Sequence, residues 1–159
     1  MPLIETIPET VTFAAAHFVY VEVNGDFVEN APLAWKLFHS LTHGKFTEDQ
    51  IVGFLGLGKI DYEKEGDEAF IYQAGIMLKA KPAQLSDRLR YKSISRSNYA
   101  SFTLLGSYSQ LADTYPEIFM ILDKTKLKIR SDFCIERYLN DPAEVPEDQL
   151  KTEILIPIL

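Results

Sequence analysis

The stretch FVYVEVNGDFVE (residues 18–29) decides the fold, because its pattern returns in ASFTLLGSYSQ (residues 100–110), about 81 positions further along the chain. In both stretches an apolar, alternating run ends at a glycine, Gly25 in the first and Gly106 in the second. Alternation with a period of two is typical of a β-strand, and glycine is typical of a turn. This self-similarity predicts two copies of one structural unit.

A helix-start pattern follows each glycine. Asp26 stands three residues before Glu29, and Ser107 stands three residues before Gln110. In such a capping box the first side chain accepts a backbone N–H of the first helical turn, while the Glu or Gln reaches back to the N–H of the capping residue. Apolar residues at helical spacing follow, so each copy is predicted to contain one amphipathic helix.

Each predicted helix contains a proline, Pro32 or Pro116, which removes a backbone donor. The first helix therefore starts either at Asp26 or at a later Asn30 cap. Two further strands are predicted after each helix, at residues 52–62 and 68–78 in the first copy and at 132–139 and 152–158 in the second. The resulting order is β-α-β-β, twice.

We expect an α+β fold in which the two β-α-β-β units, residues 11–80 and 96–159, form one concave antiparallel sheet with both helices on one face. A cleft between the helices follows from that arrangement. A chain of 159 residues that is 47% hydrophobic suits one domain, so residues 1–159 are predicted to form a single unit of folding. The connection over residues 79–96 is expected to be a mobile crossover.

Composition excludes several classes of function. The formal net charge is −7 and no run of Lys or Arg exceeds two residues, so direct nucleic-acid binding is not expected. No apolar stretch approaches the roughly 20 residues of a membrane helix, and no leader pattern opens the chain, so a cytoplasmic protein is expected. Cys134 is the single cysteine, and its expected role is that of a small buried apolar residue. The histidines lack metal-ligand spacing, so neither a metal nor a cofactor is expected.

Three motifs in the second copy carry a resemblance to a known family: YASFTLLGSY (residues 99–108), IERYLNDP (residues 135–142) and LKTEILIP (residues 150–157). Together they resemble the gyrase-inhibitor-like small-molecule-binding domain, which is also the effector domain of AraC-type and MerR-type multidrug regulators. The resemblance implies a cleft for amphipathic, often cationic aromatic compounds, with a glutamate in it. Residues 1–12 are too few for a DNA-reading domain, so a stand-alone form is expected.

Glu136 holds the position of the family's cleft glutamate, and Glu153 that of a second acid found in some members. Strand alternation places Glu136 on one face with Cys134 and Tyr138. The alternatives are a solvent-facing acid and an ion pair with a neighbour such as Arg130. In the internal alignment Glu136 falls near Gly56 and Glu153 near Tyr72, so the first copy has no matching acid. The full set of predicted ligand-binding residues is Glu136, Tyr138, Glu153, Trp35, Tyr72, Tyr99 and Tyr115.

For the aromatic members of that set, core packing is the alternative role. Tyr108 stands at a family signature position, where a rim or capping contact is the alternative.

The leading functional hypothesis is a small-molecule-binding protein for sensing or sequestration of amphipathic, cationic aromatic compounds. The resemblance also implies two others. One is a hydrolase of reactive cyclopropane-type electrophiles, with Glu136 as the base and Tyr138 beside it. The other is a protein inhibitor of DNA gyrase, so the expected partners are a small molecule and a protein such as gyrase or a regulator, but no membrane.

Overall fold

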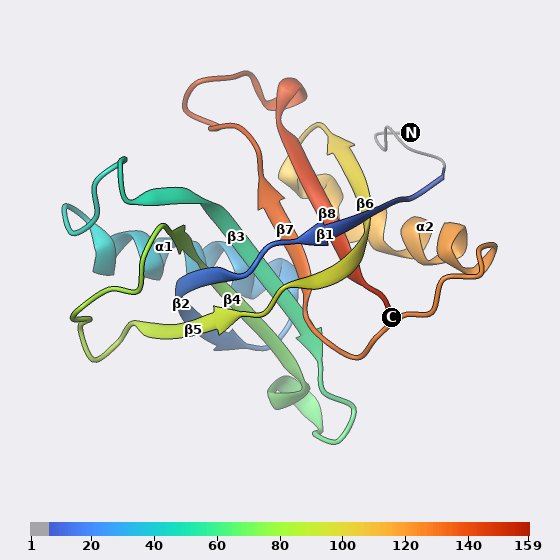
Figure 1. Cartoon of the computed structure of the whole chain (residues 1–159), viewed down its shortest axis with the longest axis horizontal. Coiled ribbons are helices and arrows are strands. Elements are labelled where there is room, and N and C mark those ends of the chain that lie inside the picture. The colour runs from blue at the N-terminus through green and yellow to red at the C-terminus, as the bar shows by residue number, and fades with distance from the viewer. Residues whose placement is uncertain (1–6) are drawn as a thin grey trace. The chain divides into compact units, whose positions relative to one another are not determined.

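The computed structural model describes residues 7–159, which fall into two compact units (Figure 1). The first unit comprises residues Ala14–Arg96. The second unit comprises residues Ser97–Leu159 together with the N-terminal segment that ends at Phe13. Each unit has four antiparallel strands, one α-helix and its own core.

The first unit is a four-stranded sheet with one helix against it (Figure 1). Its elements are β2 (Ala16–Asn24), α1 (Phe27–Thr42), β3 (Ile51–Ile60), β4 (Phe70–Leu78) and β5 (Arg90–Ile94), with the strands in the order β3-β4-β2-β5. A 3-10 turn, Gly66–Ala69, precedes β4. Ala34 and Phe38 on α1 pack against Val19 of β2 and Ile76 of β4, so the core of this unit lies between the helix and the central strands.

The second unit repeats this plan (Figure 1). Its elements are β1 (Glu9–Phe13), β6 (Ser97–Leu105), α2 (Leu111–Asp123), β7 (Cys134–Tyr138) and β8 (Lys151–Pro157), with the strands in the order β1-β6-β8-β7. Two 3-10 turns, Tyr108–Gln110 and Glu147–Gln149, precede α2 and β8. Ile118 and Leu122 of α2 pack on Phe102 of β6 and Ile154 of β8.

The two copies exchange their leading strands. Strand β1 precedes β2 in the chain but pairs with β6 of the other copy, where Glu9 lies opposite Ser101. Conversely, β5 precedes β6 but pairs with β2, where Ile94 lies opposite Ala16. The segment predicted as a plain crossover, residues 79–96, therefore contains a strand. Its pairing partner is distant in sequence, which local periodicity cannot reveal.

The predicted helix caps are confirmed in position. The Asp26 side chain accepts the N–H of Val28 at 2.8 Å and that of Glu29 at 3.3 Å, and α1 starts at Phe27. The helix continues through Pro32, so the predicted restart at Asn30 is wrong: the Asn30 amide instead donates to the Asp26 carbonyl at 2.9 Å. In the second unit, Ser107 caps the 3-10 turn that leads into α2.

Gly25 and Gly106, the residues from which the repeat was recognised, share a backbone requirement. Their φ values are +122° and +134°, a conformation that side chains with a Cβ rarely adopt. A Cβ would also lie 2.7 Å from an amide atom of Asn30 in one unit and of Gln110 in the other. The repeated glycine is therefore demanded by the sharp turn from strand to helix.

The α+β class and the duplicated β-α-β-β unit are confirmed. The cleft between the helices and the single domain over residues 1–159 stay predictions, and the first six residues of that domain lie outside the described part of the chain. Over residues 7–159, no helix combines the length and the apolar character needed to cross a membrane.

Gly75 in the middle of β4 offers a test of the first unit's packing. A Cβ there would lie 2.1 Å from the Val19 carbonyl oxygen and 2.8 Å from the Phe18 ring, so neighbouring backbone must shift. We expect Gly75→Ala to lower the free energy of unfolding by about 3 kcal/mol, measured by urea denaturation. Gly58→Ala is the matched control on β3, because its Cβ would meet the Phe27 ring at an ordinary 3.8 Å. Equal effects of the two variants would contradict this account.

Candidate functional site

The Glu136 carboxylate is held by two tyrosine hydroxyls within the second unit. On β7, Glu136 lies directly opposite Ile154, a core residue beneath α2, so its side chain is on the face that the helix covers. The Tyr115 hydroxyl donates from α2 to Oε2 at 2.7 Å, and the Tyr138 hydroxyl donates from β7 to Oε1 at 2.7 Å. Of the predicted ligand-binding residues, the structure therefore brings three together: Glu136, Tyr115 and Tyr138.

Burial dominates the electrostatics of this acid. Loss of hydration raises the pKa of the Glu136 carboxyl, and the hydrogen bonds from Tyr115 and Tyr138 lower it without cancelling the effect of burial. Two donors occupy only half of the lone-pair sites of a carboxylate, which has about four. The group therefore keeps acceptor capacity for a cation, a ligand N–H or a water molecule.

An aromatic wall continues from Tyr138. Its ring meets that of Tyr108 edge to face, with 5.3 Å between the centroids. Burial raises the pKa of the Tyr108 hydroxyl, and the nearby charge of Asp141 adds to the effect. Tyr108 was expected as a family signature position and was not included among the ligand-binding residues. The position of Tyr108, two residues after Gly106 at the start of the helix, is the sequence feature that could have predicted its contact with Tyr138.

Cys134 lies on the same face of β7 and packs against the core under α2. Burial, followed by the charges of Glu136 and Asp132, raises the pKa of its thiol to about 12. The thiol therefore stays protonated at neutral pH and is a poor nucleophile. Cys134 therefore packs as a small apolar residue, as predicted, but it is half-buried instead of fully buried.

The alternative prediction of an ion pair between Glu136 and Arg130 is wrong. Arg130 forms its salt bridge with Asp132, and its Nε donates to the Ile158 carbonyl at 3.2 Å. Its guanidinium also lies over the Tyr99 ring, 5.4 Å from the centroid. The Glu136 carboxylate is thus stabilised by neutral hydroxyl donors.

Glu153 and Tyr99 lie on the opposite face of the same sheet. In the strand register, Glu153 of β8 lies opposite Arg137 of β7 and Thr103 of β6, whereas Glu136 lies opposite Ile154. Because neighbouring residues of a strand point to opposite faces, Glu153 and Ile154 lie on different faces of the sheet. The Ser101 hydroxyl donates to Glu153 at 3.1 Å. Tyr99, only 2% exposed, contacts Phe13 edge to face on that side. A ligand role for these two residues stays a prediction, and it is separate from the face that carries Glu136.

Strand register corrects one detail of the internal alignment. Gly56 lies opposite Ala74 as Glu136 lies opposite Ile154, so Gly56 is the counterpart of Glu136, as predicted. Glu153 directly precedes Ile154 in β8, and Gln73 directly precedes Ala74 in β4. The counterpart of Glu153 is therefore Gln73 instead of Tyr72. The two units therefore differ where the site is built, because the first has no side chain at the position of the acid.

Trp35 and Tyr72 form a separate pair in the first unit. The Trp35 indole donates from α1 to the Tyr72 hydroxyl on β4 at 2.9 Å. Tyr72 is 5% exposed and belongs to the core, while the Trp35 ring lies 6.2 Å from that of Phe54 and 5.7 Å from that of His39. Trp35 and Tyr72 therefore pack against other side chains, which was the alternative role considered for these aromatics. Their role in ligand binding stays a prediction.

A sequence comparison identifies the family of this chain. The profile of the family described as "GyrI-like small molecule binding domain" matches residues 7–159. The chain therefore belongs to the GyrI-like small-molecule-binding family. Curated proteins offer no match to the chain.

Solved structures with the same fold come from several proteins of low sequence identity. The C-terminal domain of EcmrR is 10% identical with a TM-score of 0.77, covering 100% of this chain and 99% of that domain. SAV2435 bound to tetraphenylphosphonium is 13% identical with a TM-score of 0.72, covering 96% and 93%. A protein described as a hydrolase from Listeria innocua is 14% identical with a TM-score of 0.58, covering 98% and 93%. At these low sequence identities, the structural similarity establishes a shared fold and nothing about function.

The raised pKa of Glu136 predicts a pH dependence of stability. A folded-state pKa above the unfolded value of about 4.3 means that the folded protein binds the proton more tightly, so this contribution is present at low pH and is lost as the pH rises through the folded pKa. Glu136→Gln removes the titrating group. We expect the free energy of unfolding of this variant, relative to wild type, to increase between about pH 4 and pH 8, measured by urea denaturation.

Glu144→Gln, in an exposed loop, controls for the loss of one negative charge. A direct measurement is the carboxyl carbon chemical shift of Glu136 followed by NMR during a pH titration.

Tyr115→Phe removes one donor and should raise the Glu136 pKa further. An unchanged or lower pKa in that variant would contradict the assigned hydrogen bond.

Proposed function

We propose that this protein binds amphipathic, cationic aromatic compounds at Glu136 and acts in their sensing or sequestration in the cytoplasm. The observation that carries this proposal is the partly buried Glu136 carboxylate with a tyrosine hydroxyl on each oxygen. Within residues 7–159 no salt bridge to Glu136 is found, and the carboxylate under the helix has already lost part of its hydration in the free protein. A ligand cation then gains more from the acid than it would in water.

The tyrosines supply the second half of the recognition. Tyr108 and Tyr138 present rings at 62° to each other beside the acid, and Tyr115 approaches it from α2. Aromatic faces attract cations and also bury the apolar body of a ligand. The neighbour SAV2435 is described as bound to tetraphenylphosphonium, an aromatic cation, which supports this ligand class for the shared fold.

A hydrolase is the second candidate, favoured by the raised pKa of the same acid. A carboxyl whose pKa lies nearer neutrality is a better general base, and Glu136 retains lone pairs that can accept a proton from water. In hydrolysis of an activated cyclopropane, the water proton passes to Glu136 as the water oxygen bonds to a ring carbon, and the C–C bond from that carbon to the carbon bearing the electron-withdrawing group breaks. The carbanion left on the latter carbon then takes the proton back from Glu136. A structural neighbour described as a hydrolase supports this candidate. The contact with DNA gyrase stays a prediction.

Tetraphenylphosphonium provides the test of cation binding. We expect Glu136→Gln to weaken its binding by at least about tenfold, which corresponds to roughly 1.4 kcal/mol, measured by isothermal titration calorimetry. Stability at neutral pH should not fall, because an amide still offers hydrogen-bonding atoms to both tyrosines. Glu144→Gln is the matched control, because it removes the same charge from an exposed loop of the second unit. Equal weakening in both variants would assign the effect to net charge and reject the site.

Incubation with an activated cyclopropane separates binding from hydrolysis. If the second candidate holds, the wild-type protein forms the ring-opened alcohol, Glu136→Gln forms none, and Tyr138→Phe forms it more slowly at an altered pH optimum. Product analysis by mass spectrometry is the readout. Product formation at the same rate by Glu136→Gln would exclude this acid as the base.

A further inference from the structure

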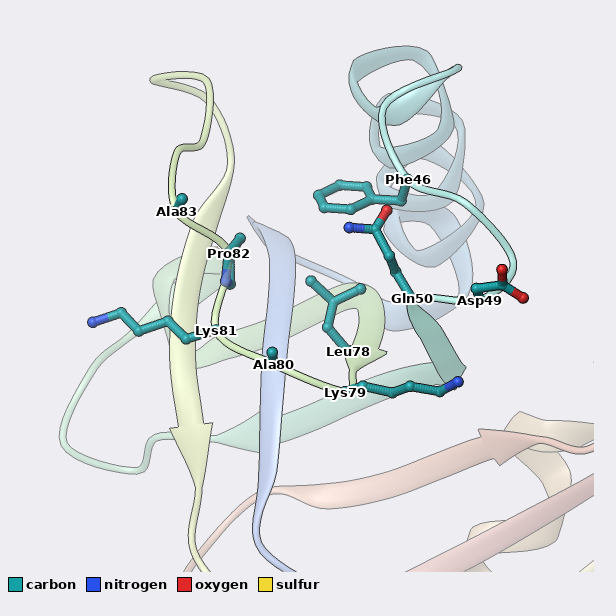
Figure 2. A pocket seen from close by; sticks show the side chains of 9 residues that line it. All are labelled: Phe46, Asp49, Gln50, Leu78, Lys79, Ala80, Lys81, Pro82 and Ala83. Atoms are coloured by element: carbon teal, nitrogen blue, oxygen red, sulfur yellow. The ribbon is translucent and has the colours of Figure 1, made fainter.

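A concave site lies within the first unit, whereas Glu136 belongs to the second. It is a hollow of about 290 Å³ at the end of β4, lined by Phe46, Asp49, Gln50, Leu78, Lys79, Ala80, Lys81, Pro82 and Ala83. Figure 2 shows the Phe46 ring and the Gln50 amide on one wall, Pro82 and Ala83 on the other, and Leu78 between them. The volume is at the small end of the range of about 300–1,000 Å³ for ligand pockets.

The Gln50 side chain is fixed in orientation. Its Oε1 accepts the backbone N–H of Thr47 at 2.9 Å and lies 3.3 Å from the Thr47 hydroxyl, which donates to it. A backbone N–H can only donate, so the oxygen must occupy this position and Nε2 the other. In Figure 2 that nitrogen points into the hollow. A hydrogen-bond donor of set orientation therefore faces the apolar part of the hollow, which is formed by Phe46, Leu78 and Pro82.

The two walls are also held together by the backbone. The Lys79 N–H donates to the Gln50 carbonyl oxygen at 3.0 Å, which ties the segment after β4 to the turn before β3. Leu78, 5% exposed, is anchored in the core of the first unit. The distance between the Gln50 backbone and the Leu78 floor is thus set by a backbone hydrogen bond, so the hollow does not depend on flexible side chains alone.

The charges at the rim favour an anion. Lys79 and Lys81 stand against a single carboxylate, Asp49, whereas the whole chain has a net charge of −7. The lysine side chains extend outward from the rim in Figure 2, and the Lys81 ammonium lies over the Tyr91 ring, 5.2 Å from its centroid. They contribute a local positive potential at the entrance, and their long stems allow closer approach to a bound anion.

We propose that this hollow binds a small organic carboxylate with an apolar, aromatic body. The carboxylate accepts the Gln50 Nε2–H near the entrance, where the two lysines of the rim add positive potential, while the body packs against Phe46, Leu78 and Pro82. The charge preference is opposite to that of the Glu136 site. The protein then has one site for a cation in the second unit and one for an anion in the first.

Naphthalene-2-carboxylate is a suitable probe for an NMR titration of the full ¹⁵N-labelled chain at millimolar concentrations. We expect saturable shifts of the Gln50 side-chain NH₂ and of the backbone amides of Lys79, Ala80 and Ala83. Naphthalen-2-ylmethylammonium, which has the same body and the opposite charge, should shift none of them. Shifts by both probes, or by neither, would overturn the proposal.

Gln50→Glu is the decisive variant. The new side chain still offers an oxygen to Thr47, but it replaces the donor that faces the hollow with an anionic oxygen, so binding should weaken at least tenfold. Gln149→Glu, which adds the same charge in an exposed position of the second unit, is the control and should bind as wild type. Glu136→Gln should also leave naphthoate binding unchanged. Wild-type affinity in a folded Gln50→Glu variant would reject the site.

Discussion

The exchange of leading strands is the constraint on which both units depend. Strand β1 is the outer neighbour of β6, and β5 is the outer neighbour of β2, so each copy completes the sheet of the other. A three-stranded sheet with one helix would leave the backbone donors and acceptors of β2 and β6 unpaired along one edge. The exchange satisfies these groups and makes the stability of each copy depend on residues of its partner copy.

The same scaffold carries different chemistry in its two copies. At equivalent places in the sheet, the first copy has Gly56 and the second has Glu136. The helix facing these strands contributes a donor in each case: Trp35 donates to a tyrosine in the first unit, and Tyr115 donates to the acid in the second. Duplication therefore supplied the frame, while the functional asymmetry lies in a few substitutions at the interface of helix and sheet.

Neutral donors suit an acid that has to remain available. A salt bridge to Arg130 would have filled the coordination of Glu136 with a fixed cation, and a ligand cation would have had to displace it. The hydroxyls of Tyr115 and Tyr138 stabilise the charge by hydrogen bonding alone, and burial still keeps its pKa raised. This balance serves binding and general-base chemistry equally, which is why both functions are tested on the same residue.

The sequence by itself determined the repeat, the strand-to-helix turns and the identity of the acid. These are local properties: Gly25 and Gly106 are required by their own backbone angles, and Asp26 caps the helix that begins at the next residue. Tyr115 was one of the aromatic residues predicted to bind ligand, but its hydrogen bond to Glu136 is known only from the structure. Pro32 misled the prediction, since a proline weakens a helix without always ending it.

Only the tertiary structure decided the partners that are distant in sequence. The pairing of β5 with β2 depends on a ladder between segments about 70 residues apart, which no local pattern encodes. Similarly, alternation placed Glu136 and Glu153 each on one face of a strand, but the register of β7 against β8 was needed to show that the faces are opposite. The Gln50 hollow arises in the same way, because it forms where the chain before β3 meets the chain after β4.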